Sequence, residues 1–295
     1  MTPADYDFLR IWVKERSGLA LSDDKQYLVT SRLLPVARRA GLPGIGELVT
    51  ALRMATDGVL MTAVVEAMTT NESFFFRDKT PFEHFRQTVM PALMAARRDA
   101  RTIRIWSAAS STGQEPYSLA MCLQDMAAEL AGWRIDIVAT DLSNAVLERA
   151  RQGLYSHFEV QRGLPIRLLI QYFARHGDRW QIAPELRAMV RYRQFNLLAD
   201  FASLGMFDLI FCRNVLIYFD RDTKIDVLGR MARMTASDGY LVLGTAETVI
   251  GLTERFKPLA DKRGLYVPNT AATMRRDAAE AAKAVPHLVA ITGGR

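Results

Sequence analysis

The stretch T-I-R-I-W-S-A-A-S-S-T-G-Q-E-P-Y-S, residues 102–118, decides the fold. It predicts a short strand at Thr102–Trp106 and a helix at Pro116–Leu130, because a proline suits the first turn of a helix. Small residues fill the turn between the two elements, so its backbone can approach a ligand closely.

The alternation of strands and helices continues from this stretch to residue 267. Further strands are predicted at Arg134–Ala139, Met189–Phe195, Phe207–Cys212 and Gly239–Gly244, with helices at Ser143–Arg151 and Thr223–Met234 and a closing segment at Gly264–Val267. Such alternation implies a mostly parallel sheet with helices on both faces, a doubly wound α/β fold. Sheets of this class bind ligands at the carboxyl ends of their strands.

Residues 1–69 have the apolar spacing of helices and predict a small all-α domain before the sheet. The predicted helices are Asp5–Arg16, Asp24–Arg39, Ile45–Ala55 and Val59–Met68, with Pro35 able to kink or split the second. Residues 70–80 are interpreted as a connector, whose F-F-F run we expect in the core between the two domains. A helix at Thr80–Ala96, with Thr80 as its N-cap, leads into the α/β domain, residues 81–268.

Two segments depart from this rhythm. Residues 153–187 are long for a crossover and are rich in turn residues, which predicts a small inserted subdomain. Residues 269–295 are rich in Ala, Arg and Gly and predict a mobile C-terminal tail, with a transient helix near Thr273–Ala284.

Composition limits the class of protein. The net charge of +6 suggests an acidic partner, which can be a nucleic acid, an anionic membrane or an acidic protein surface. We find neither a transmembrane helix nor a signal peptide in the sequence. Cys122 and Cys212 lie in apolar surroundings and no Cys or His pair has metal-ligand spacing, so we expect buried thiols, no metal and a reducing cytoplasm.

Acidic residues follow the first two strands of the predicted sheet. Gly113 is the only glycine of the first turn, and Glu115 stands beside it. A glycine-rich turn cradles a pyrophosphate, whereas an acid suits an ammonium or a hydroxyl. Asp141 ends the second strand, where a carboxylate can accept hydrogen bonds from both hydroxyls of a ribose. The pattern favours a nucleoside without phosphates over NAD. The alternatives are that the turn after the first strand is an ordinary strand-to-helix turn and that Asp141 only caps the following helix.

Asparagines follow the next two strands. Asn196-Leu197 comes after the third strand and Asn214-Val215 after the fourth. An asparagine offers donors and acceptors to an adenine edge or to an amino-acid head group. A lone asparagine is usually a turn residue, but two at successive strand ends favour a ligand.

With these motifs in place, the chain resembles the chemotaxis receptor methyltransferases of the CheR type, from its helical N-terminus to about Pro268. The motifs are T-N-E-S-F-F-F-R at 70–77, W-S-A-A-S-S-T-G-Q-E-P-Y-S at 106–118, A-T-D-L-S at 139–143, F-N-L at 195–197 and R-N-V-L-I-Y-F-D at 213–220. In this order they are highly specific, although the turn reads T-G-Q-E where the family pattern has T-G-E-E.

The resemblance implies a Rossmann-like sheet that binds S-adenosylmethionine and a cytoplasmic, monomeric enzyme that esterifies glutamates on the helical bundle of chemoreceptors, releasing S-adenosylhomocysteine. Its implied cofactor contacts are Asn71, Ser73, Arg77, Glu115, Asp141, Asn196, Leu197, Asn214 and Val215. Arg77 and Tyr218 are implied nearest the reacting carboxylate, and Arg32, Arg38 and Arg39 are implied to face the receptor. In some members the insert grips a receptor peptide; segment 174–182 is short here, which leaves that open.

Methyl transfer to a glutamate needs no general base, because a carboxyl with a pKa of about 4.3 is ionised at neutral pH. The four histidines are therefore expected to be surface or structural residues. Arg77 is expected to orient the carboxylate, or else to serve the cofactor or the connector, and Tyr218 to align the acceptor. A nucleic-acid methyltransferase, which would carry an N-P-P-Y type motif after the fourth strand, and a non-catalytic S-adenosylmethionine sensor are the alternatives.

Overall fold

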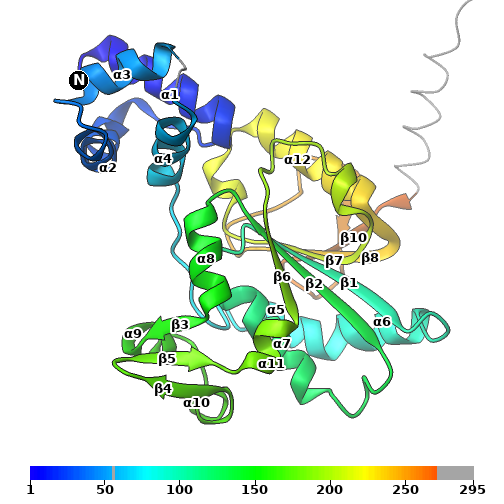
Figure 1. Ribbon diagram of the computed structural model, residues 1–295. Coiled ribbons are helices and arrows are strands. Elements are labelled where there is room, and N and C mark those ends of the chain that lie inside the picture. The colour runs from blue at the N-terminus through cyan, green and yellow to red at the C-terminus, as the bar shows by residue number, and fades with distance from the viewer. Residues whose placement is uncertain (55–56, 271–295) are drawn as a thin grey trace, which may run out of the picture.

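A computed structural model describes residues 1–54 and 57–270. Its centre is a seven-stranded sheet in the order β6-β2-β1-β7-β8-β10-β9 (Figure 1). The strands are β1 Thr102–Ala108, β2 Arg134–Asp141, β6 Val190–Gln194, β7 Phe207–Cys212, β8 Thr235–Leu243, β9 Phe256–Pro258 and β10 Leu265–Pro268. The first five run parallel, and β10 pairs antiparallel with β8 and β9. The predicted doubly wound α/β fold is confirmed.

Alternate side chains of the central strands pack into two separate apolar cores, one on each face of the sheet. Leu209 and Phe211 of β7 face one core, whereas Ile210 and Cys212 face the other. The first core packs under α5 (Thr80–His84), α6 (Met90–Ala96) and α7 (Gln114–Asp125), and the second under α12 (Arg221–Met234). A strand that is apolar on both sides reads as a continuous apolar run, which is the pattern of L-I-F-C at residues 209–212.

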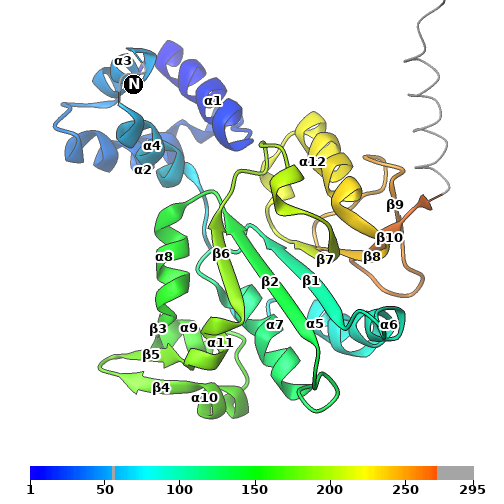
Figure 2. The same ribbon diagram turned by 45° about the vertical axis from the view of Figure 1, so that its right-hand side comes forward.

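Four helices form a separate N-terminal bundle with its own apolar core (Figure 2). They are α1 Pro3–Ser17, α2 Gln26–Arg39, α3 Ile45–Met54 and α4 Gly58–Met68. Pro35 lies inside α2, which continues through it as one helix, so of the two possible effects of this proline the split does not occur. Each helix of the bundle and of the sheet domain, within residues 1–54 and 57–270, is too short or too polar to span a bilayer.

The insert carries a small sheet of its own in the order β3-β5-β4. Its elements are β3 Leu154–Ser156, α9 His157–Gln161, α10 Ile166–Tyr172, β4 Phe173–His176, β5 Arg179–Ile182 and α11 Pro184–Ala188. α8 (Asn144–Gln152) leads into it, with the Ser143 side chain as the predicted N-cap. The insert therefore packs beside the main sheet as an antiparallel β-subdomain.

The structure corrects three local predictions. α7 ends at Asp125, well before Leu130. The helix after the connector begins at Thr80 with Lys79 at its N-cap position, and a π-helix at Phe85–Val89 separates α5 from α6. Phe75 and Phe76 belong to the core of the sheet domain, not to a core between the domains. The predicted tail helix lies outside the described residues.

The N-terminal bundle is joined to the strand ends of the sheet domain by polar contacts. Leu19 and Phe219 form an isolated antiparallel β-bridge, and the Ala20 N–H donates to the Tyr218 carbonyl at 2.9 Å. Beside them, the Lys14 ammonium lies 2.5 Å from the Asp220 carboxylate, which also caps α12. These contacts hold the end of α1 against the turn that follows β7.

Asp220→Ala removes both the ion pair and the N-cap, so we expect a loss of about 1 kcal/mol at pH 7. The hydrogen bond from Lys14 lowers the pKa of Asp220 from 3.8 to about 2. A carboxylate whose pKa is lower in the folded than in the unfolded protein stabilises the fold at pH values above its unfolded-state pKa. This stabilisation is lost as the pH falls through its folded-state pKa. Urea titrations should show that the difference in the free energy of unfolding between Asp220→Ala and the wild type becomes smaller between pH 4 and pH 2. Asp220→Asn, which keeps a capping side chain, should lose less at pH 7; an equal loss would contradict the capping role.

Candidate functional site

A cavity open to solvent lies at the carboxyl ends of β1, β2 and β7, where the strand order reverses direction along the chain. Its walls come from the connector, the strand-end turns and the end of α1, which contributes Ser17 and Leu19. The predicted residues that line it are Asn71, Ser73, Arg77, Glu115, Asp141, Asn196, Leu197, Asn214, Val215 and Tyr218. Arg32, Arg38 and Arg39 do not line it.

The turn after β1 depends on its single glycine. Gly113 has a φ of 94°, and a Cβ there would lie 2.7 Å from the Tyr192 hydroxyl and 3.0 Å from the Ala150 Cβ. Ala109 and Ser111 also have left-handed backbones, with φ of 57° and 50°. This tight path brings the backbone to the cavity wall, and a larger residue at position 113 would displace it.

Glu115 lies at the start of α7 with only 12% of its side chain exposed, and both its carboxylate oxygens are engaged. The Ser107 hydroxyl donates to one oxygen at 2.8 Å, and the Arg213 guanidinium donates to the other at 2.9 Å. Burial raises the pKa of Glu115, and the charge of Arg213 opposes that rise. The residue thus presents a paired carboxylate to the cavity.

Asp141 at the end of β2 accepts hydrogen bonds from two backbone N–H groups. Ser111 donates to one oxygen at 2.9 Å and Ser143 to the other at 3.0 Å. Burial raises the pKa of Asp141, and these backbone donors oppose the rise. Each oxygen retains capacity for a further donor. Carboxylates at two strand ends fit a ligand with hydroxyl and ammonium groups and repel phosphates, which supports the predicted choice of nucleoside.

The side chain of Asn196 is engaged inside the protein. Its amide nitrogen donates to the Arg16 carbonyl at 2.7 Å, and its amide oxygen accepts from the Leu198 N–H at 2.9 Å. This amide therefore joins α1 to the third strand end, a role that the sequence did not indicate. Leu197, the next residue, is buried and lines the cavity.

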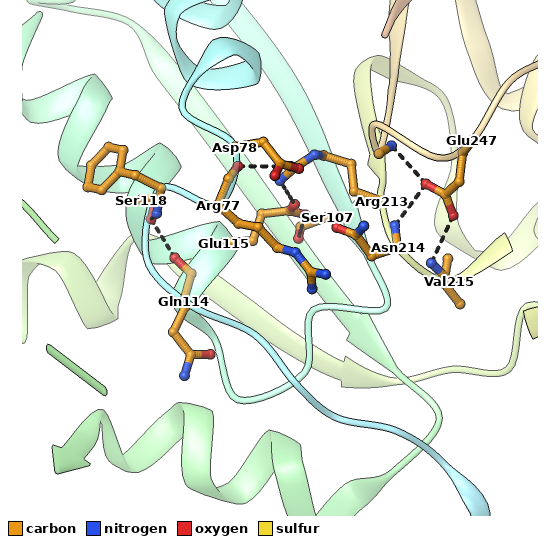
Figure 3. Close-up of polar contacts among 12 residues, drawn as sticks. Arg77, Asp78, Ser107, Gln114, Glu115, Ser118, Arg213, Asn214, Val215 and Glu247 are labelled. Atoms are coloured by element: carbon orange, nitrogen blue, oxygen red, sulfur yellow. Dashed lines mark hydrogen bonds and ion pairs between the residues drawn. The ribbon is translucent and has the colours of Figure 1, made fainter. Parts of the chain in front are cut away.

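Glu247 is a buried carboxylate that the sequence analysis missed. It accepts from the N–H groups of Asn214 at 2.8 Å and Val215 at 3.0 Å (Figure 3). It also accepts from the N–H groups of Leu216 at 2.8 Å and Gly244 at 2.7 Å. Asn214 is held in a left-handed backbone with a φ of 59°. Glu247 thus fixes the backbone of the Asn214-Val215 turn through these hydrogen bonds. The available signal in the sequence was an acidic residue three positions after Gly244, the glycine that follows β8.

Arg213 is the second residue that was missed. Its side chain is 1% exposed and lies between Glu115 and the connector, where it donates to the Arg77 carbonyl at 2.8 Å and to the Asp78 carboxylate at 2.7 Å (Figure 3). A charged residue directly after the apolar strand β7 was the available signal. The contact joins the fourth strand end to the connector.

Arg77 and Tyr218 both lie on the walls of the cavity. The Arg77 guanidinium donates to the Glu72 carbonyl at 3.1 Å and stands 5.4 Å from the centre of the Phe74 ring. The Tyr218 hydroxyl has no hydrogen-bond partner among the described residues. Both side chains retain donors for a bound molecule.

Arg32, which we predict to face a receptor, is engaged by hydrogen bonds within the chain. Its guanidinium donates to the carbonyls of Met68 and Thr69 at 2.6 and 3.0 Å and to the Thr70 hydroxyl at 3.0 Å. It therefore closes the end of α4 and holds the start of the connector. Arg38 and Arg39 are exposed at the end of α2.

Glu247→Gln tests the turn after β7. A glutamine offers one acceptor oxygen where four N–H groups converge, and its own NH₂ faces the others, so we expect a stability loss of ~3 kcal/mol. Calorimetry should also show weaker binding of the cofactor. Glu254→Gln, at an exposed carboxylate, is the matched control. Unchanged stability and affinity in the Glu247 variant would show that the carboxylate does not support the turn.

Comparisons with known proteins agree with this site. The family model described as "CheR methyltransferase, SAM binding domain" matches residues 71–265, and "CheR methyltransferase, all-alpha domain" matches residues 4–69. Chemotaxis protein methyltransferase 1 of Pseudomonas aeruginosa is 41% identical over 266 residues, which cover 89% of this chain and 96% of that protein. Chemotaxis protein methyltransferase Cher2 of Pseudomonas putida is 40% identical, covering 88% of this chain and 96% of that protein. The Escherichia coli chemotaxis protein methyltransferase is 37% identical, covering 86% and 88%.

The two family models together span the helical bundle and the sheet domain. The model that matches the sheet domain is described as binding S-adenosylmethionine, a phosphate-free nucleoside of the kind that the acidic strand ends fit. The chain therefore belongs to the CheR methyltransferase family, and S-adenosylmethionine is its cofactor.

Proposed function

We propose that this chain transfers the methyl group of S-adenosylmethionine to glutamate side chains of chemoreceptors and forms methyl esters. The relatives named chemotaxis protein methyltransferases support the substrate class. The observation that carries the chemistry is that Arg77 and Tyr218 line the same cavity as Glu115 and Asp141. Groups suited to a carboxylate and groups suited to a cationic nucleoside thus share one space.

Four strand-end residues would hold the cofactor. Asp141 suits the ribose hydroxyls, Glu115 suits an ammonium group, and the Asn214-Val215 turn, fixed by Glu247, suits the nucleoside. The bound cofactor supplies an activated methyl group on a positively charged sulfur. The cavity is lined by the carboxylates of Glu72, Glu115 and Asp141 and by the guanidinium groups of Arg77 and Arg213, and this surplus of negative charge matches the cationic sulfur.

The acceptor needs positioning and not deprotonation. A glutamate is ionised at neutral pH, and neither His84, His157 nor His176 lines the cavity. Arg77 would orient the carboxylate by a charge-assisted hydrogen bond, and Tyr218 would align it with its free hydroxyl. Displacement of water from the cavity would raise the reactivity of the carboxylate oxygen.

The receptor would approach over the end of α2. Arg38 and Arg39 are exposed there, and their charges complement an acidic helical bundle. Arg32 is omitted from this surface because its guanidinium is engaged with the connector. We place the reaction in the cytoplasm, where the receptor bundle lies, and propose that the enzyme acts as a monomer.

The decisive assay is transfer of labelled methyl groups to purified chemoreceptor fragments. We expect label that is released by mild base, the mark of an ester, and that disappears when the acceptor glutamates are replaced by alanine. Parallel reactions with RNA and DNA distinguish a nucleic-acid methyltransferase. Tight cofactor binding without transfer to any of these would instead indicate a sensor and would refute the proposal.

Arg77→Ala should lower kcat for receptor methylation about 100-fold, because the carboxylate loses its charge-assisted partner. The melting temperature should stay near that of the wild type, since Arg77 is only half-buried. Arg98→Ala, at an exposed arginine, serves as the control. A variant that lost cofactor affinity but kept kcat would assign Arg77 to the cofactor and not to the acceptor.

Arg32 and the Arg38–Arg39 pair should behave differently. Replacing Arg38 and Arg39 by alanine should raise the KM for the receptor about fivefold, more at low than at high salt, and leave cofactor affinity unchanged. Arg32→Ala should weaken cofactor binding about threefold even without receptor, because Asn71 and Ser73 follow the residues it holds. Calorimetry and receptor kinetics measure the two effects. The same phenotype in both variants would contradict this division.

A further inference from the structure

The connector makes a strained turn at residues 76–79, directly beside the cavity. Phe76, Asp78 and Lys79 have φ values of 51°, 68° and 49°, a left-handed backbone that residues with a side chain rarely adopt. Such strain persists only where the surroundings fix it. Arg77, the residue proposed to orient the acceptor, lies in the middle of this turn.

Two groups of the sheet domain hold the turn. The Ser118 hydroxyl of α7 accepts from the Phe76 N–H at 3.0 Å, and the Phe76 ring packs edge-on against Phe82 with 5.2 Å between ring centres. On the other side, one nitrogen of the Arg213 guanidinium donates to both the Arg77 carbonyl and the Asp78 carboxylate. The turn is thus held by α7 on one side and by the residue that follows β7 on the other.

Arg213 links Glu115 on the cavity wall to Asp78 of the connector. Its other terminal nitrogen donates to Glu115, so one buried cation is shared by two carboxylates on opposite sides (Figure 3). The Asp78 side chain is 27% exposed, whereas that of Glu115 is 12% exposed. The link can therefore be cut at Asp78 without leaving Arg213 buried and unpaired.

We infer that Arg213 and Asp78 are positioning residues that lock the 76–79 turn and so set the place of Arg77 beside the reacting carboxylate. The inference rests on the proposed function, because it takes Arg77 as the group that orients the acceptor. Weakening the Asp78 contact should let the turn relax while Glu115 keeps Arg213 on the cofactor side. The catalytic rate should then fall more than the cofactor affinity.

Asp78→Asn is the first test. Asparagine tolerates a left-handed backbone, so the change removes the charge and leaves the backbone preference. We expect kcat for receptor methylation to fall about fivefold, with the dissociation constant of S-adenosylmethionine within about twofold of the wild type and an unchanged melting temperature. Glu83→Gln, a loss of charge at an exposed carboxylate of α5, is the matched control and should alter none of these.

A double-mutant cycle distinguishes positioning from a general structural role. If Asp78 acts through Arg77, adding Asp78→Asn to Arg77→Ala should lower kcat no further. Arg213→Lys, which also loses contact with Glu115, should lower kcat and weaken cofactor binding together. The inference would be overturned if the two substitutions lowered kcat multiplicatively in the cycle. It would also be overturned if Asp78→Asn kept the full kcat, or if this variant lost both melting temperature and affinity for S-adenosylmethionine.

The wild type provides the separate control for the proposed function. Absence of base-labile label on the receptor with wild-type enzyme refutes the proposed function itself. A wild type that esterifies the receptor beside an Asp78→Asn variant with full kcat refutes the positioning pair alone. The two failures therefore have different signatures in one set of assays.

Discussion

Buried carboxylates at the strand ends require partners from the protein before any ligand arrives, and the site is built from those partners. Asp141 and Glu247 accept from backbone N–H groups, and Glu115 accepts from a hydroxyl and from Arg213. A buried charge without such bonds would be costly, so each acid dictates the path of the chain around it. The turns that face the cofactor are the result of that requirement, and the buried guanidinium offsets only part of the negative charge.

The same requirement explains why the connector and the N-terminal bundle belong to the site. The Ser111 hydroxyl of the first turn donates to the Asn71 carbonyl at 2.8 Å, and Asn196 reaches the end of α1. From the bundle, Glu66 accepts from the Ser143 hydroxyl at 3.0 Å, at the start of α8. The strand ends are therefore closed by segments that precede the sheet in the chain, and a sheet domain alone would leave these polar groups without their partners.

The sequence predicts a feature of this structure when the interacting residues lie close together along the chain. Local patterns identified the parallel sheet, the turn at Gly113 and the acids at strand ends, because each signal lies within a few residues. Arg213 and Glu247 were missed because their partners lie 98 and 33 residues away, at Glu115 and Asn214. The F-F-F run was misplaced for a related reason: an apolar run indicates burial, but it does not indicate which of two cores buries it.

Arg32 shows that a basic residue on a surface helix need not be a docking group. Helix termini leave carbonyls without partners, and a long guanidinium can satisfy several of them from a neighbouring helix. Arg32 does this for the end of α4, and its third contact continues to Thr70, next to Asn71. α2 thus carries exposed charges at its end and, in its middle, an arginine that binds the start of the connector. The helix proposed to meet the receptor is therefore in direct contact with a segment that lines the cofactor cavity.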